Sequence, residues 1–164
     1  KPINTMTTAR DPEGRKTIYD VLPAQYKNLK YVGRLDYKTT GLLLLTNDGG
    51  LARRLTLPLS NIPRVYIATV SGTDFSKLDR ARQGITVDGI KYRPMKIKVL
   101  KNNELQVTIT EGKKNEVCIV LNAVGVPVKK LHRISYGPVR LGNLSTGEII
   151  EIAQKSIDLM SKSF

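Results

Sequence analysis

The stretch from Gly33 to Gly49, GRLDYKTTGLLLLTNDG, sets the strongest limits on what this chain can fold into. The continuous apolar run over residues 42–45 lies between turn-forming residues, a pattern typical of a strand buried on both faces. Just before this run stands Asp36, a carboxylate between Arg34 and the leucines. A carboxylate held where water is scarce and positive charge is near can act as a positioned nucleophile. Asp36 is therefore the first candidate functional residue.

Arg34 and Asp36 also allow a plainer interpretation, a structural ion pair. Thr39, Thr40 and Gly41 would then only shape a turn. Spacing alone favours the ion pair, because an Arg-x-Asp tripeptide is common. The catalytic interpretation depends on the wider string and on the motifs that follow it.

Basic residues dominate the charge of the chain. Its 164 residues include 27 Lys and Arg against 14 Asp and Glu, a formal net charge of +13. This excess indicates a polyanionic partner, with nucleic acid before membrane because no amphipathic basic helix stands out. Simple solubility is the alternative. The candidate contact segments are Arg53-Arg54, Lys91–Arg93, Lys96–Lys98 and Lys129–Arg133.

Cysteine and histidine are scarce. Cys118 is the single cysteine, which excludes an internal disulfide and, with one histidine, leaves no classical zinc set. We therefore expect a reducing compartment, the cytoplasm. No apolar run approaches the ~20 residues that a membrane-spanning helix needs.

The residue pattern predicts an α+β fold with a mostly antiparallel sheet, in one domain with a soft boundary between two lobes near Arg64. Short strands are expected over 3–9, 42–45, 64–70, 128–136 and 149–152, and hairpin strands over 85–87, 96–100 and 105–110, with turns at Asp88-Gly89 and Asn102-Asn103. Helices are expected over 17–22, from 49 to about 57, from Thr73-Asp74 through 83, over 117–124, and at the end of the chain.

Four segments in order resemble the RNA pseudouridine synthase family, in its RsuA-type branch that modifies ribosomal RNA. They are KPINTMTTARDPEGRKTIYDVLP, GRLDYKTTGLLLLTNDG, RVYIATVSG and EGKKNEVCIVLNAVGVPVKKLHRISYGPVRLGNL. The resemblance implies a pseudouridine-synthase-like α+β fold, with helices flanking a mixed, mostly antiparallel sheet that carries a cleft. It also implies that uridines within ribosomal RNA are isomerised to pseudouridine, by a monomer that needs no metal or cofactor.

The resemblance assigns roles to individual residues. Asp36 matches the nucleophile, which attacks either the sugar at C1′ or the base at C6, and both routes stay open. Tyr66 matches the tyrosine that stacks on the target base and is a candidate for removing the C5 proton; an ordinary strand tyrosine is the alternative. Arg34 would hold the loop or the displaced nucleotide. Substrate contacts are expected from Thr39, Arg64, Lys113, Lys129, Lys130 and Arg133.

The third motif departs from the family pattern, which usually reads Glu-Gly-Lys-Asn-Arg-Gln-Ile/Val-Arg-Arg. Without gaps, this chain places Asn115 at the first arginine, Glu116 at the glutamine, and Cys118-Ile119 at the final two arginines. The last segment of this motif usually supplies a cation that pairs with the catalytic aspartate. Here Arg34, Lys113, Lys114 or backbone donors would have to keep Asp36 ionised, or activity would suffer.

Other interpretations follow from the same residues. Cys118 is not expected to be a nucleophile, because no partner pattern accompanies it, and His132 suits contact with the RNA backbone or a solvated strand face. An RNA-binding or ribosome-assembly factor that has lost turnover is the main alternative function, and retaining glycoside hydrolysis is weaker because no second acid lies in a comparable motif. Relatives usually carry a small RNA-binding domain before the catalytic one, and nothing in this sequence corresponds to it. Either such a domain precedes Lys1, which we expect, or the catalytic domain selects RNA alone.

Overall fold

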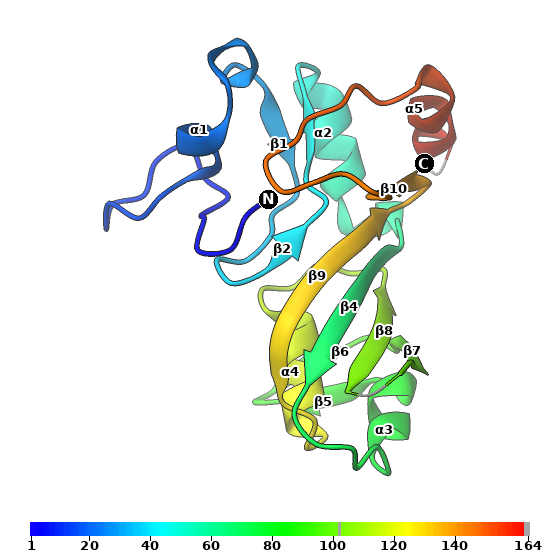
Figure 1. The fold of residues 1–164 in the computed structure, drawn as a ribbon. Helices are drawn as coiled ribbons and strands as arrows, with labels where there is room; N and C mark the ends of the chain where they lie inside the picture. Colours follow the sequence, from blue (N-terminus) through cyan, green and yellow to red (C-terminus); the bar gives the residue numbers. More distant parts are fainter. Residues whose placement is uncertain (102, 163–164) are drawn as a thin grey trace.

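Two long strands join the two parts of the molecule. The computed structural model describes residues 1–101 and 103–162. In Figure 1 the blue and cyan segments and the C-terminal residues form the upper part, and the green and yellow segments form the lower part. β4 (Arg64–Val70) and β9 (Val128–Tyr136) pair antiparallel and run between them. Among the described residues, no helix has the length and apolar character to cross a bilayer.

The main sheet is mostly antiparallel, as predicted. Its strands lie in the order β10-β9-β4-β8-β7, and β2 adds to β9 in parallel. The other bounds in this sheet are β2 Thr40–Gly41, β7 Lys96–Val99, β8 Glu104–Ile109 and β10 Val139–Arg140. The turn predicted between β7 and β8 includes Asn102, which lies outside the described residues.

The lower part packs helices against the alternating apolar face of this sheet. Alternate residues of β4 are buried, from Arg64 to Val70, and the predicted helical stripe that begins at Val117 packs in the same cluster. The elements here are α3 (Leu78–Gln83), α4 (Glu116–Ala123) and the separate hairpin of β5 (Ile85–Val87) with β6 (Ile90–Tyr92).

The upper part has its own apolar cluster. It includes Leu55, Ile62, Tyr136 and Met160, whereas Tyr66 and Leu131 belong to the lower cluster. Its elements are α1 (Ile18–Val21), the 3₁₀ turns η1 (Ala24–Tyr26) and η2 (Pro58–Ser60), β1 (Lys30–Val32) paired with β3 (Leu44–Thr46), α2 (Gly49–Thr56) and α5 (Gln154–Ser161). The soft domain boundary near Arg64 stays a prediction; β4 begins at Arg64, and its pairing with β9 shifts register between Val65 and Tyr66.

Three predicted elements are wrong. Residues 3–9 make one isolated bridge, Met6 to Thr17, instead of a strand. Residues 149–152 are not a strand either: Ile150 is exposed, and Ile152 packs against the upper apolar cluster without any strand pairing. α3 begins at Leu78 and not after Asp74, because the Asp74 carboxylate accepts a hydrogen bond from Ser76 N–H in a local turn.

The four-leucine run is also not one strand. Leu44 and Leu45 lie in β3, whereas Leu42 and Leu43 form the link between β2 and β3, which belong to two different sheets. The cause is Leu42, whose N–H donates to the Arg133 carbonyl at 2.8 Å and whose own carbonyl accepts from Arg133 Nε at 2.8 Å. Arg133 thus uses both backbone groups of the residue where the strand would have continued.

Gly41 is the closest approach between this loop and β9. Its φ is +108°, and a Cβ built there would lie 2.2 Å from the carbonyl oxygen of Arg133. We expect Gly41→Ala to lower the free energy of unfolding by about 3 kcal/mol, because the loop must separate from β9. Gly142→Ala is the matched control: φ is +56° but no atom lies within 4 Å of the built Cβ, so about 1 kcal/mol is expected. Equal losses in urea denaturation would contradict this account.

Candidate active site

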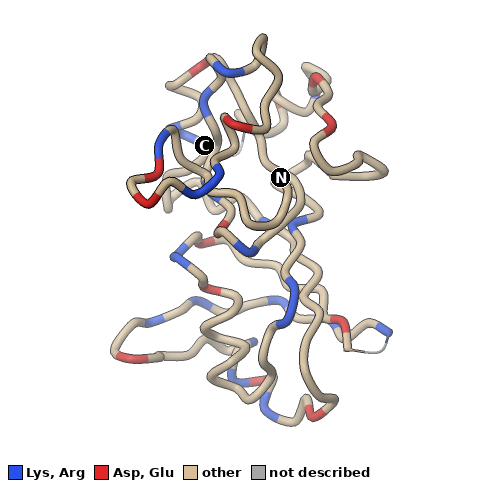
Figure 2. Tube along the Cα trace, turned by 60° about the vertical axis from the view of Figure 1, so that its left-hand side comes forward, with Lys and Arg blue, Asp and Glu red and all other residues tan. Residues whose placement is uncertain are grey.

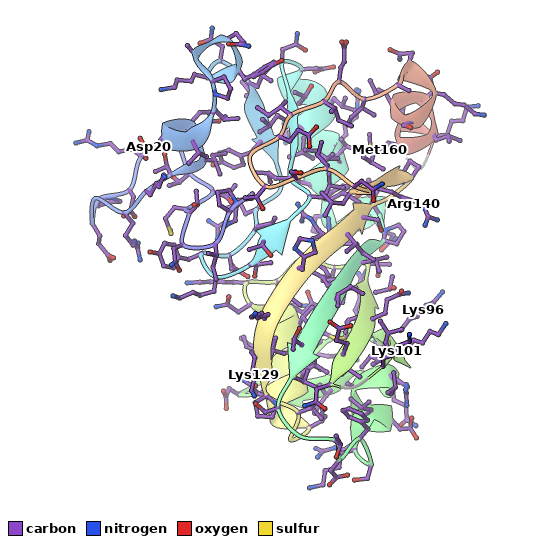
Figure 3. All side chains as sticks on the ribbon, in the orientation of Figure 1. Asp20, Lys96, Lys101, Lys129, Arg140 and Met160 are labelled. Atoms are coloured by element: carbon purple, nitrogen blue, oxygen red, sulfur yellow. The ribbon has the colours of Figure 1, made fainter. Side chains whose placement is uncertain are left out.

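A cavity of about 920 Å³ gathers most of the residues that the sequence singled out. Leu35 and Tyr66 of the lower apolar cluster line it together with Thr56 and Pro58 from the α2–η2 segment. The predicted site residues in its wall are Arg34, Asp36, Thr39, Arg64, Tyr66, Lys113 and Arg133. Lys129 and Lys130 are exposed and do not line it; Figure 3 shows Lys129 at the lower end of β9.

The Asp36 loop is held in place by the N-terminal segment. Thr7 Oγ1 donates to the Leu35 carbonyl at 2.8 Å and accepts from Leu35 N–H at 3.3 Å. A turn closes on the other side of Asp36, where Thr39 N–H donates to its carbonyl at 2.9 Å. The backbone of Asp36 is therefore fixed on both sides, and its half-buried side chain lines the cavity.

The ion pair between Arg34 and Asp36 does not form, so that interpretation is wrong. Arg34 is exposed, and among the described residues no Lys, Arg or His nitrogen lies within 4.0 Å of the Asp36 carboxylate. Lys113, another expected partner, pairs with Glu111 instead. The carboxylate is left available to a ligand.

Lys1 is a cation near Asp36 that the sequence did not indicate as functional. Its Nζ donates to the Pro2 and Thr5 carbonyls at 2.9 and 2.7 Å. Burial lowers the pKa of Lys1 to about 8, and the charge of Asp36 opposes that change. The charges of Lys1 and Asp36 therefore attract each other, although the two side chains form no direct ion pair. Only the Lys-Pro pair of the first resembling segment could have pointed to it.

Arg133 differs from the surface contact expected of it. Its side chain is 1% exposed, and it lies opposite Tyr66 in the pairing of β9 with β4. Nε is used by the Leu42 carbonyl, but Nη2 is buried without a hydrogen-bond partner among the described residues. Buried polar groups without partners are rare and call for a functional explanation. Arg133 thus belongs to the wall of the cavity and does not present its guanidinium to a phosphate on an open strand face.

His132, beside it, is also engaged. Its Nδ1 lies 2.7 Å from Thr40 Oγ1, and burial lowers its pKa. The half-buried ring therefore helps to join β2 to β9. A solvated position facing RNA is not what the structure shows.

Tyr66 is 7% exposed, and no hydrogen bond involves its hydroxyl among the described residues. Tyr136 behaves differently: its hydroxyl donates to the Leu55 carbonyl at 2.9 Å and accepts from Arg64 Nη2 at 3.3 Å. The guanidinium carbons of Arg64 and Arg133 lie 5.0 and 5.1 Å from the Tyr136 ring centre. Tyr136 is a structural link, whereas the Tyr66 hydroxyl is free to act on a ligand.

Two glutamates in the cavity wall were not singled out as a pair. The carboxyl groups of Glu111 and Glu116 are close enough to interact, and Lys113 bonds to both, through Nζ to Glu111 and through N–H to Glu116. Burial, followed by the hydrogen bond and charge of Glu111, raises the pKa of Glu116 to about 7. Burial would also raise the pKa of Glu111, but hydrogen bonds from Arg93 N–H and Lys113 outweigh it and leave that pKa below its ordinary value. Five residues apart in sequence, these acids gave no recognisable spacing.

Cys118 stands where the third motif would have an arginine. Its thiol is half-buried, and burial together with the charge of Asp36 raises its pKa. The raised pKa disfavours a thiolate, which supports the prediction that Cys118 is not a nucleophile.

Basic side chains are spread over the whole molecule (Figure 2). Lys91, Arg93, Lys113 and Lys114 reach the cavity. Lys96 instead lies on the β7 side of the molecule, opposite Lys129 in Figure 3. Only some of the predicted basic contact segments therefore reach the cavity that contains Asp36.

Comparison with known proteins identifies the class to which this fold and site belong. The family described as RNA pseudouridylate synthase matches residues 1–123. A crystal structure of a pseudouridylate synthase superposes with a TM-score of 0.89 at 30% identity, covering 98% of this chain and 70% of that one. The chain belongs to the RNA pseudouridylate synthase family, and the predicted fold class is confirmed.

Individual relatives agree with the RsuA-type resemblance. The chain is 42% identical over 159 residues to an "Uncharacterized RNA pseudouridine synthase" of Aquifex aeolicus, covering 94% of this chain and 64% of the relative. It is 35% identical over 164 residues to the "Ribosomal large subunit pseudouridine synthase B" of Bacillus subtilis, covering 96% and 67%. The chain thus spans about two thirds of the length of these relatives.

Tyr136→Phe tests the contacts that join Leu55 in the upper part to Arg64 at the start of β4. We expect the free energy of unfolding to fall by about 1–2 kcal/mol, because the Leu55 carbonyl keeps only Ser60 Oγ, at 3.3 Å, as a side-chain donor and Arg64 loses an acceptor. Tyr66→Phe is the matched control and should stay within about 0.5 kcal/mol, since its hydroxyl has no partner to lose. Chemical denaturation of both variants decides the matter, and similar losses would refute the assignment.

Proposed function

We propose that this chain is the catalytic part of an enzyme that isomerises uridines in cytoplasmic ribosomal RNA to pseudouridine, with Asp36 as the nucleophile. The observation that carries the proposal is the unpaired Asp36 carboxylate in one cavity with Tyr66 and Arg133. Membership of the family and similarity to ribosomal large subunit synthases support the reaction and the class of RNA.

The reaction breaks the N1–C1′ bond of uridine, turns the retained base, forms a C5–C1′ bond and releases the C5 proton. An ionised Asp36 would stabilise or capture C1′ as the uracil anion leaves, or would add to C6 of the base. Both routes need an ionised carboxylate that the uridine can reach, and nearby positive charge favours the ionised form. Lys1 and Arg133 would supply positive charge around it, in the role left vacant at Cys118.

The target uridine must leave its stack to reach Asp36, which costs a few kcal/mol and least in loops and bulges. Stacking on the Tyr66 ring and phosphate contacts from Arg34, Lys113 and Lys114 at the cavity would offset that cost. Arg64 is better suited to a structural role, because its guanidinium is occupied by the Glu111 carbonyl at 2.9 Å and by Tyr136.

Asp36→Asn should abolish pseudouridine formation, by roughly 10³-fold or more, because an amide cannot act as the nucleophile. Carbodiimide mapping of ribosomal RNA from cells that carry only the variant would measure it. Asp48→Asn is the control: Asp48 caps α2 by accepting from Leu51 N–H at 3.0 Å, and asparagine caps equally well. Unchanged pseudouridine at every site with Asp36→Asn would refute the proposal.

Tyr66→Phe separates stacking from proton transfer. We expect turnover to fall about 10²-fold if the hydroxyl removes the C5 proton, while affinity for RNA changes less than about threefold because the ring remains. Single-turnover rates and filter binding with one uridine-containing hairpin would report the two effects. Full turnover in the variant would leave Tyr66 with stacking alone.

The absence of a close cation at Asp36 within the described residues also favours a second candidate, an RNA-binding or assembly factor with reduced or lost turnover. In that case the purified chain would bind ribosomal RNA fragments without converting uridine. Cys118→Arg would then restore conversion, because it returns the guanidinium that the third motif usually carries.

A further inference from the structure

The loop over residues 111–116, between β8 and α4, is closed by the side chains at its two ends. Lys113 joins the two acids, because its N–H donates to Glu116 Oε2 at 3.0 Å and its Nζ pairs with Glu111, and the two carboxyl groups interact with each other. The residues between them include Lys113 and Lys114, which are exposed and line the cavity. Asn115 turns the chain into α4 with φ +52°, a conformation that asparagine tolerates. The carboxyl contact therefore determines where the two lysines are presented.

Glu111 is the anchored member of the pair. Its Oε1 accepts from Arg93 N–H at 2.6 Å, and its Oε2 pairs with Lys113 Nζ. The Glu111 carbonyl accepts from Arg64 Nη1 at 2.9 Å. With these donors in place, Glu111 keeps its charge and can accept one further hydrogen bond.

Glu116 is the member that lacks a full set of partners. It is 3% exposed. Its Oε2 accepts from Lys113 N–H at 3.0 Å, whereas its Oε1 is buried without a partner among the described residues. An ionised carboxylate in this position would face the charge of Glu111 and leave a buried oxygen unsatisfied, both of which are costly. A proton on Glu116 removes both costs, since its O–H can donate to Glu111.

We propose that Glu116 is a positioning residue for RNA binding: the proton it shares with Glu111 keeps the loop closed and holds Lys113 and Lys114 at the cavity. Loss of that proton puts a second negative charge into the cavity wall and opens the loop, so affinity for RNA falls. The proposal rests on RNA being the ligand of this cavity, but it does not require turnover.

Charged groups surround the pair on several elements. Lys113 lies on the same loop, Arg93 follows β6, and Arg64 comes from β4. Asp36 and Arg133 face the same cavity from the β2 loop and β9. Burial raises the pKa of Glu116 to about 7, above its ordinary value of 4.5, so the protonated form is lost as pH rises through neutrality. Affinity should therefore be higher at pH 6 than at pH 8.

Glu116→Gln provides the decisive experiment, because the amide N–H can donate to Glu111 at every pH. Binding of a uridine-containing RNA hairpin is measured from pH 6.0 to 8.0 at constant ionic strength. For the native chain we expect the dissociation constant to rise roughly five- to tenfold over this range. For Glu116→Gln it should stay near the low value and rise less than about twofold. Lys1, with a pKa of about 8, and His132, whose pKa burial lowers, are present in both proteins, so the difference in slope isolates the pair.

Two further variants serve as controls for the pH dependence of binding. Glu104→Gln removes one exposed carboxylate at the start of β8, away from the cavity, and should keep the native pH slope. Burial does most to raise the pKa of Glu116, and the contact and charge of Glu111 add to it. Glu111→Gln removes that charge and should reduce the slope even if Glu116→Gln does not fold.

The outcomes separate this inference from the proposed reaction. A native slope that persists in Glu116→Gln, or a Glu116 carboxyl that titrates near pH 4.5 by ¹³C NMR, would overturn the inference. Chains that show the expected slopes but never convert uridine would overturn the proposed reaction and leave the inference standing.

Discussion

The buried side chain of Arg133 is the constraint on which the site depends. Its Nε and its backbone carbonyl both engage Leu42, which interrupts the apolar run and pins the end of the Asp36 loop against β9. Arg133 also lies opposite Tyr66 in the pairing of β9 with β4, so Tyr66 is held next to the residue that fixes the Asp36 loop. One arginine thus brings into register two segments that are about thirty residues apart in the chain. Because its Nη2 remains unused, the residue that organises the cavity also offers it a positive charge.

Elements with a clear period could be predicted from the sequence. β4 alternates buried and less buried residues from Arg64 to Val70, and α4 carries an apolar stripe from Val117, so strand and helix were both correctly placed. Most of the candidate site residues could also be predicted, because they lie in motifs that occur together in one family. The structure places them in the wall of one cavity. Local pattern and motif order pointed to the same fold in these segments.

The failures have a common physical origin in long-range contacts. Apolar residues at 42–45 looked like one strand, but a partner some ninety residues later in the chain determines where the strand ends. The Glu111–Glu116 contact depends on burial and on donors from Arg93 and Lys113, none of which leaves a periodic trace. Arg34 and Asp36 are neighbours in sequence, yet the loop turns their charges apart. Spacing reports proximity along the chain, whereas these features depend on what the fold brings from elsewhere.

The contacts of Tyr136 affect how rigid the cavity is when RNA binds. Fully buried, it bonds to Leu55 in the upper part and to Arg64 at the start of β4, with two guanidinium groups close to its ring. Any tilt of one part against the other would strain these contacts and the pairing of β4 with β9 beside them. The frame around Asp36 is therefore stiff, and the width of its opening is set before RNA arrives. In such an arrangement the nucleic acid is the flexible partner, and selection among uridines falls to those whose surroundings distort most cheaply.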